Sequence, residues 1–239
     1  MPLLVIADNS IAQLYKQHKA QGSLIISSLD GTSIYVHNQI LSEKRFVPAS
    51  TFKILNTLIA LQENVIDEKQ IIKWDEENRV YQSWNRDQTL ESAFKVSCVW
   101  CYQEFAKQIG NERYLKYLKE THYGNEKTGK DLSRFWLDGD LKISAQEQIA
   151  FLKKVYLEEL NFKSKNIKLL KKIMLEKETP KYSLSAKTGW SNKVGWYVGY
   201  IEVNDKVWLF ASNLEINSKE DLKLRKSLVI EAFKLKKIL

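Results

Sequence analysis

Short apolar segments, rich in β-branched and aromatic residues, lie near both ends of the chain and predict β-strands. The first block, residues 23–38, has apolar residues on both sides of Asp30-Gly31, a dipeptide that favours a tight turn. The second block follows Pro180 and carries Asn204-Asp205 between its last two segments. We therefore predict a hairpin in the first block and a further set of strands in the second. The segments of the second block are residues 182–188, 194–203 and 207–213.

Between these blocks, apolar residues recur at intervals of three and four, which is the period of a helix. Pro48 stands just before the first such stretch, and its apolar face contains Phe52, Leu55, Leu58 and Ile59. Helices are therefore predicted through most of residues 50–175. The remaining predicted segments are residues 90–109, 113–119, 144–157 and 166–175.

Two serines predict where helices begin. Ser144, with Glu147 three residues later, has the pattern of a capping box, and Ser218 with Asp221 has the same spacing before an amphipathic stretch at residues 222–239. Because strands flank a helical insert, we predict an α/β fold, in which an antiparallel sheet built from both chain ends carries flanking helices and an all-helical subdomain is inserted. One domain would cover residues 1–239, with the α/β layer at about 1–47 and 180–239 and the helical subdomain at about 48–179.

Composition narrows the class of protein. The chain has 239 residues, of which 44% are hydrophobic, so it can bury a sizeable core and is not of disordered composition. Its apolar runs are too short for a helix that spans a membrane. The net charge is +8, but the lysines are scattered, for example over residues 163–177, and not gathered in one stripe with stacking aromatics. We expect a solvated basic surface and no nucleic-acid partner, with a polyanion or an anionic membrane as the alternative.

The N-terminal segment gives little information on location. Residues 1–7 are mostly apolar, but they lack a basic start and are too few for the apolar part of a secretory signal peptide. The sequence is therefore interpreted either as a cytoplasmic protein or as one whose signal peptide has been removed.

The two cysteines, Cys98 and Cys101, form a C-x-x-C pair, which is typical of a redox site or of half a zinc site. Zinc takes about four ligands, and neither a second cysteine pair nor a histidine cluster occurs among His18, His37 and His122. Because the pair lies within a helical pattern and does not follow a buried strand, we expect two buried free thiols. A disulfide or a redox role is the alternative.

One segment resembles a phosphate-binding loop. Residues 124–131 match the pattern up to the last position, where Asp131 stands in place of the serine or threonine that would contact Mg²⁺. No strand-like segment leads into it, so we interpret the match as chance.

Ser50 and Lys53 form the first motif that carries chemistry, an S-x-x-K sequence. If Ser50 opens a helix, the two residues share a face, which places an amine beside a hydroxyl nucleophile. A lysine pKa of about 10.4 makes a poor base, but burial lowers it by up to about 3–5 units, and the apolar neighbours Phe52, Ile54 and Leu55 favour burial. Alone, the motif is equally typical of an N-cap serine followed by a surface lysine.

A second motif, Lys187-Thr188-Gly189, follows the strand-like stretch before it. S-x-x-K on a helix with K-T-G on a later strand is the pattern shared by penicillin-binding proteins and serine β-lactamases. Their order, separated by a helical block, makes a chance match much less credible. A cationic strand beside a nucleophile also suits an anionic substrate.

Along nearly its whole length the sequence resembles the class D (oxacillinase-type) serine β-lactamases. Further segments that match the family's motifs are Ser97-Cys98-Val99, Tyr123-Gly124-Asn125, Gln82-Ser83-Trp84, Phe135-Trp136-Leu137, Gly195-Trp196-Tyr197-Val198-Gly199 and Leu224-Arg225-Lys226-Ser227. Trp100 departs from the family, which commonly carries proline there, and the segment between Gly189 and Gly195 is short. These departures put the substrate spectrum in doubt and leave the chemistry untouched.

The resemblance implies a serine β-lactamase or penicillin-binding-protein-like fold, with one catalytic domain that hydrolyses cyclic amides. Ser50 would form the acyl-enzyme, Lys53 carboxylated by CO₂ would be the general base, and Ser97 would pass a proton to the leaving nitrogen. Trp136 would hold the carbamate by a hydrogen bond. The residues implied in substrate binding are Lys187, Thr188, Gly189, Trp190, Arg225, Val99 and Leu137, with the backbone N–H groups of Ser50 and Trp190 as the oxyanion hole.

The same resemblance implies a small-molecule β-lactam as the partner, no metal, no cofactor other than CO₂ or bicarbonate, and a periplasmic or secreted location. Plain structural roles stay open: Trp136 as core, Ser97 as a helix residue, Arg225 as a surface charge and Tyr123-Gly124-Asn125 as a turn. A β-lactam sensor domain that stays acylated is the nearest competing function. A cell-wall transpeptidase or carboxypeptidase is a further one.

Overall fold

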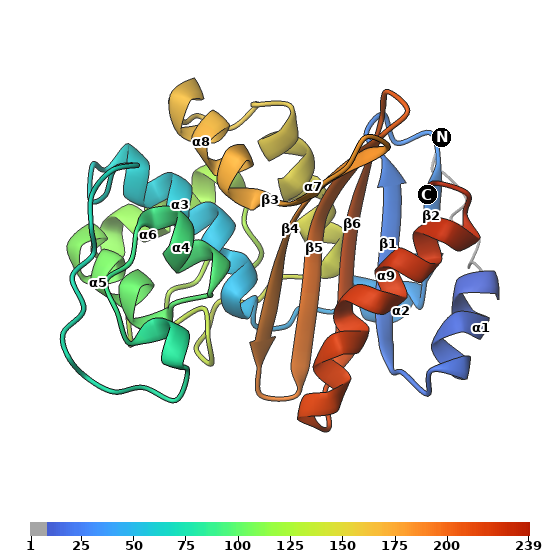
Figure 1. Cartoon of the computed structure of the whole chain (residues 1–239), viewed down its shortest axis with the longest axis horizontal. Helices are drawn as coiled ribbons and strands as arrows, with labels where there is room; N and C mark the ends of the chain where they lie inside the picture. The colour runs from blue at the N-terminus through green and yellow to red at the C-terminus, as the bar shows by residue number, and fades with distance from the viewer. Residues whose placement is uncertain (1–8) are drawn as a thin grey trace.

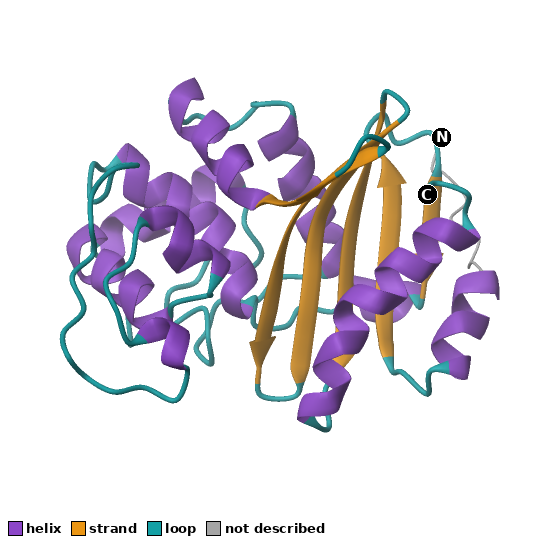
Figure 2. Cartoon of the chain, in the orientation of Figure 1, coloured by secondary structure: helices purple, strands orange, loops and turns teal. Residues whose placement is uncertain are grey.

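A single antiparallel sheet contains strands from both ends of the chain, as Figures 1 and 2 show. The structure is a computed structural model and describes residues 9–239, so the expectation for residues 1–7 lies outside the described residues. The strand order is β2-β1-β6-β5-β4-β3, which confirms the predicted fold class. The strands are β1 (Gly22–Ser28), β2 (Ile34–His37), β3 (Leu175–Glu178), β4 (Tyr182–Ser191), β5 (Val194–Val203) and β6 (Lys206–Glu215).

Helices cover both faces of the sheet and also stand beside it. They are α1 (Asn9–Gln17), α2 (Gln39–Glu43), α3 (Lys53–Gln62), α4 (Leu90–Lys95), α5 (Val99–Ile109), α6 (Asn111–Thr121), α7 (Ala145–Tyr156), α8 (Ser164–Met174) and α9 (Leu224–Leu235). In Figure 1, α1 and α9 lie on one face of the sheet and α2 and α7 on the other, while α3 to α6 and α8 form a helical block beside β4. The boundary between this block and β4 is where the predicted motifs meet.

The two faces of the sheet bury two separate apolar cores. Along β5, Trp196 and Val198 point into the core shared with the helical block, whereas Tyr197 and Ile201 point into the core under α1 and α9. This alternation follows from the two-residue period of a strand. Buried on both faces, β5 lies in the centre of the molecule and supports its neighbour β4.

Local signals predicted most of the element boundaries. Asn204 and Asp205 both adopt left-handed backbone angles in the turn between β5 and β6, as a tight hairpin turn requires. Ser144 accepts the N–H of Glu147 and caps α7, and Ser218 and Asp221 form the second predicted capping box. A short 3₁₀ helix over Lys219–Lys223 follows Ser218, so α9 begins two residues later than predicted and ends at Leu235.

The predicted continuous helix over residues 90–109 was wrong. The chain forms α4 and α5 instead, with a break at residues 96–98. Ser97 has φ 55°, a left-handed angle that a continuing helix does not admit, and Cys98 begins the next helix as its N-cap. The helices α1 and α2 and the exposed strand β3 were not predicted. Within residues 9–239, no helix is both long and apolar enough to span a membrane.

Candidate active site

Ser50 lies in a 3₁₀ turn over Ala49–Phe52 that leads directly into α3. The Ala49 N–H donates to the carbonyl of Trp136 at 2.8 Å, and the Thr51 N–H donates to the carbonyl of Pro48 at 3.1 Å. The side chain of Ser50 is mostly buried and reaches the wall of a cavity. The nucleophile predicted from the sequence therefore stands on a turn whose backbone is held on both sides.

Lys53 is the first residue of α3 and is completely buried. Within the described chain its Nζ has no hydrogen-bond partner, and it lies 4.4 Å from the centre of the Tyr102 ring. Burial lowers the pKa of Lys53 well below its usual value, and the charge of Lys187 lowers it further. Burial therefore favours the neutral amine, the state that a base or a CO₂ acceptor needs.

Trp136 is packed in an aromatic cluster below Ser50. Its indole is 4.9 Å from the Phe135 ring and 5.8 Å from the Phe52 ring, measured between centroids. Its Nε1–H is buried and has no acceptor among residues 9–239. A buried donor without an acceptor costs roughly 1–3 kcal/mol. The Trp136 indole and the Lys53 amine are therefore two buried polar groups that could each bind an added group, since no described residue is hydrogen-bonded to either.

Ser97 and Lys187 come together across the boundary between the helical block and β4. The Lys187 ammonium donates a short hydrogen bond to Ser97 Oγ. It also donates to the backbone carbonyl of Thr188 at 3.1 Å. Burial lowers the pKa of Lys187 to about 7, with a smaller contribution from the positive charge of Arg225. The backbone of Ser97 has a left-handed φ, so the chain leaves the helix here and the Ser97 hydroxyl faces Lys187.

Two glycines let the sheet and α9 approach the nucleophile closely. A Cβ on Gly189 would lie 3.0 Å from the Pro48 carbonyl oxygen, so only glycine lets β4 pass this close to the turn that holds Ser50. A Cβ on Gly195 would lie 2.9 Å from Cδ of Arg225. Arg225 uses this space to donate to the carbonyl of Gly189 at 2.8 Å, which anchors its guanidinium beside the K-T-G strand.

These elements enclose a cavity of about 350 Å³. Eight residues predicted from the sequence line it: Ser50, Ser97, Val99, Leu137, Thr188, Gly189, Trp190 and Arg225. Lys53, Trp136 and Lys187 are buried and are not among the residues that line the cavity. The β4 and α9 side contributes Thr188 and Arg225, and the helical side combines apolar side chains with the hydroxyls of Ser50 and Ser97 and the cation Lys95.

Sequence reasoning assigned no role to several residues of this site. Tyr102 lies under Lys53, and its hydroxyl is hydrogen-bonded to Thr57 at 2.7 Å. The Tyr81 and Trp84 rings pack at a tilt of 53° with their centres 4.8 Å apart, and both line the cavity with Lys95, Val96 and Leu222. Tyr102 lies within the stretch predicted as a helix at residues 90–109, but nothing local indicated which side chain it would contact.

Tyr123-Gly124-Asn125 has a structural role as a turn. The Asn125 side chain accepts the N–H of Lys142 at 2.9 Å and donates to the carbonyl of Asp140 at 2.8 Å. A Cβ on Gly124 would lie 2.0 Å from the Lys142 carbonyl oxygen. These contacts tie the segment to residues 140–142 and support the turn interpretation. The close approach to the Lys142 carbonyl also explains why glycine stands at position 124, the first residue of the segment that resembles a phosphate-binding loop.

The prediction of two free thiols was wrong, because Cys98 and Cys101 form a disulfide. Cys98 is the N-cap of α5 and Cys101 lies in its first turn, which sets their Cα atoms 5.6 Å apart. That separation lies within the range that disulfides span. The prediction rests on a helical pattern that continues through both cysteines, whereas Cys98 is a non-helical N-cap, which makes the bond possible.

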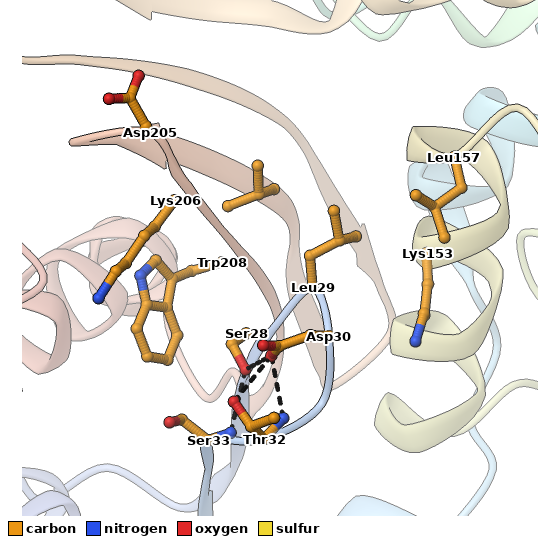
Figure 3. A pocket seen from close by; sticks show the side chains of 11 residues that line it. Ser28, Leu29, Asp30, Thr32, Ser33, Lys153, Leu157, Asp205, Lys206 and Trp208 are labelled. Atoms are coloured by element: carbon orange, nitrogen blue, oxygen red, sulfur yellow. Dashed lines mark hydrogen bonds between the residues drawn. The ribbon is translucent and has the colours of Figure 1, made fainter.

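A larger cavity, of about 530 Å³, lies away from these motifs (Figure 3). It is bounded by the turn after β1, the start of β6 and the end of α7. The polar side chains at the turn bind one another: Ser28 and Thr32 both donate to Asp30. None of the residues that line it was predicted as a site residue. Across residues 9–239, no group of three or more His, Cys, Asp or Glu side chains is arranged to hold a metal ion.

Comparison with known proteins supports this arrangement. The family described as penicillin binding protein transpeptidase domain matches residues 9–234. β-Lactamase OXA-48 of Klebsiella pneumoniae is 41% identical over 94% of this chain and 87% of its own length.

Two solved class D β-lactamases are similar in structure. That of Sebaldella termitidis has a TM-score of 0.94 at 37% identity and covers 98% of this chain and 99% of its own. FUS-1 (OXA-85) of Fusobacterium nucleatum has a TM-score of 0.95 at 32% identity and covers 98% and 100%. From these matches over nearly its whole length, this chain belongs to the class D β-lactamases.

Proposed function

We propose that this protein hydrolyses β-lactam antibiotics through an acyl-enzyme on Ser50. The observation that carries the proposal is Lys53, a fully buried amine one helical turn from the serine, with no hydrogen-bond partner among residues 9–239. Family membership supports the same reaction, since the similar proteins carry the name β-lactamase.

We further propose that Lys53 is carboxylated. A neutral amine and CO₂ combine to a carbamate with loss of one proton, and the lowered pKa of Lys53 favours the neutral amine. The unpartnered Nε1–H of Trp136 fits this group, because it is a buried donor in the same closed region and needs an acceptor. Carboxylation would supply an anionic base beside Ser50 in place of a weak amine.

The remaining steps follow from the positions of the side chains. Ser50 Oγ attacks the lactam carbonyl carbon while its proton passes to the modified Lys53. Ser97, held by Lys187, relays that proton from the modified Lys53 to the nitrogen as the lactam C–N bond breaks, which leaves Lys53 free to act as a base again. A water molecule then attacks the ester, with Lys53 again as the base. The backbone N–H groups of Ser50 and Trp190 stabilise the oxyanion in both halves.

Substrate binding is assigned to the cationic wall. Lys187, Thr188 and Arg225 would hold the carboxylate of the antibiotic, and Gly189 would let the substrate approach the strand edge. Val99 and Leu137, which both line the cavity, would flank the path of water toward Lys53. An anion next to Arg225 is favourable because this side of the cavity carries net positive charge.

We also propose a periplasmic or secreted location and one catalytic domain over the whole chain. The Cys98–Cys101 disulfide supports the location, because disulfides persist in oxidising compartments. The helical block and the sheet support a single domain, since Ser50 and Lys187 come from different parts of it and meet in one site.

The test is hydrolysis of a chromogenic penicillin by the purified protein, with and without added bicarbonate. We expect many turnovers per enzyme molecule and a higher rate with bicarbonate, because the carbamate is in equilibrium with dissolved CO₂. Intact-protein mass spectrometry after a penicillin pulse should show an adduct on Ser50 that disappears with time.

A single stoichiometric burst with a lasting adduct would contradict hydrolysis and indicate a β-lactam sensor instead. Absence of any adduct would contradict both. Ser50→Ala is the matched control, since it removes the nucleophile and leaves the charged groups of the cavity in place.

A further inference from the structure

The Cys98–Cys101 disulfide lies in the segment that presents active-site residues from the helical block. Cys98 follows Ser97 directly, and Cys101 precedes Tyr102. Both sulfur-bearing residues are completely buried, and the chain has no other cysteine. Any effect of thiol chemistry on this protein must therefore act through this one bond.

Each neighbour of the disulfide contacts a different part of the site. Ser97 accepts the hydrogen bond of Lys187, and Val99 lines the cavity. The Tyr102 ring lies 4.4 Å from Nζ of Lys53. The segment around the disulfide thus sets the positions of Ser97, the proposed proton shuttle, of Val99 in the cavity wall, and of Tyr102 against the Lys53 amine.

The backbone of this turn is held by few other bonds. Ser97 donates to the carbonyl of Phe94 at 3.2 Å, and Cys98 donates to the carbonyl of Ala93 at 2.9 Å. Ser97 has a left-handed φ of 55°, which costs a residue with a side chain about 1–2 kcal/mol. Cys98 Sγ also accepts the N–H of Cys101 and so caps α5. The covalent bond is the strongest constraint on a turn with an unfavourable conformation.

Without the covalent link, the backbone hydrogen bonds of Ser97, Cys98 and Cys101 alone would hold this turn against the cost of its left-handed residue. Phe94, Tyr102 and Phe105 are all buried next to this turn in the close-packed core. A turn that relaxes toward an ordinary backbone conformation would carry Ser97 and Tyr102 with it.

We propose that the Cys98–Cys101 disulfide is a positioning element of the active site, and that its reduction slows hydrolysis. The inference rests on the proposed function. In the reaction a dithiol attacks one sulfur as a thiolate, the S–S bond breaks, and the dithiol itself closes to a disulfide. Two electrons and two protons pass to the cysteine pair, which leaves two thiols.

The test compares three samples of the full-length protein: oxidised, reduced with dithiothreitol, and the Cys98→Ser/Cys101→Ala double variant. Serine at position 98 keeps an acceptor for the first turn of α5, so the double variant removes the covalent link and not the cap. Thiol titration establishes the redox state of each sample. We expect kcat to fall about tenfold in the reduced and the double-variant samples, a loss in keeping with a shift of the catalytic groups by less than about 1 Å.

The expected pattern distinguishes positioning from loss of structure. KM should change by less than about twofold, because Thr188 and Arg225 lie on other elements. The reduced samples should also need more bicarbonate for full activity, since Tyr102 packs against Lys53. Dithiothreitol should leave the double variant unchanged.

Three results would overturn the proposal. They are two titratable thiols in the protein purified under oxidising conditions, equal kcat in the oxidised and the fully reduced wild type, or a fall in kcat that accompanies lost far-UV circular dichroism. If the oxidised protein itself fails to hydrolyse penicillin, the proposed function fails first and this inference falls with it.

Discussion

The lysines on the two sides of the cavity are both buried but differ in their hydrogen bonds. On the helical side, Lys53 lies against the Tyr102 ring and has no hydrogen-bond partner within the described residues. On the sheet side, Lys187 and Arg225 are hydrogen-bonded to Ser97 and to backbone carbonyls. Burial lowers the pKa of both lysines, but that of Lys187 only to about 7, so Lys187 keeps part of its charge at neutral pH. The helical block therefore suits the chemistry and the sheet suits binding.

Replacement of the buried amine should give the largest effect. Lys53→Met is expected to lower kcat at least about 100-fold, because general base catalysis contributes about 10²–10⁴-fold. The free energy of unfolding of the same variant should be about 1–3 kcal/mol above that of the wild type. The reason is that a buried amine with no partner among the described residues is replaced by an apolar side chain of similar volume. Penicillin kinetics and urea denaturation measure the two effects.

The pH dependence of this stability gain has a definite sign. The pKa of Lys53 is lower in the folded than in the unfolded chain, so between the two values the unfolded state binds one more proton. The unfolding free energy of the wild type then rises with pH across that window, up to the ordinary lysine value of about 10.4. The advantage of Lys53→Met should shrink as the pH rises. A variant that is active, or less stable at pH 7, would contradict the assigned environment.

On the sheet side a smaller effect on binding is expected. Arg225→Ala should raise KM for penicillin about tenfold or more, since a hydrogen bond to a charged group contributes about 1.5–3 kcal/mol. The value of kcat should change little, because Arg225 lies away from Lys53. Arg225→Lys keeps the charge without the forked geometry and should give an intermediate KM. A fall in kcat at unchanged KM would place Arg225 in the chemistry and erase the contrast.

The smallest effect concerns the titration of Lys187. Its pKa is about 7, so the ammonium is mostly charged at pH 6 and mostly neutral at pH 8. An anionic substrate loses an attraction of about 1 kcal/mol over that range, so KM should rise about fivefold. Steady-state kinetics at several pH values give the curve, and Lys187→Met should flatten it. A KM that falls as the pH rises would show that Lys187 does not face the substrate anion.

Predictions from the sequence succeeded where neighbours along the chain decide the structure. The hairpin at Asp30-Gly31, the turn at Asn204-Asp205 and the cap at Ser144 are each set by a few adjacent residues, and all three were confirmed. The break between α4 and α5 was missed because the left-handed Ser97 has contacts far away in the sequence. Its hydroxyl binds Lys187, which is 90 residues away.

The order of the elements and the types of residue that could carry chemistry could be predicted from the sequence. Periodicity and capping depend on local hydrogen bonds and on the apolar face of one helix or strand, both of which are visible in a short segment. The sequence could not show that Lys53 lies under Tyr102 with no hydrogen-bond partner among residues 9–239, or that Cys98 is bonded to Cys101. Burial, and with it the charge of an amine, depends on contacts between elements far apart in the chain, and the packing of α3, α5 and β4 sets those contacts.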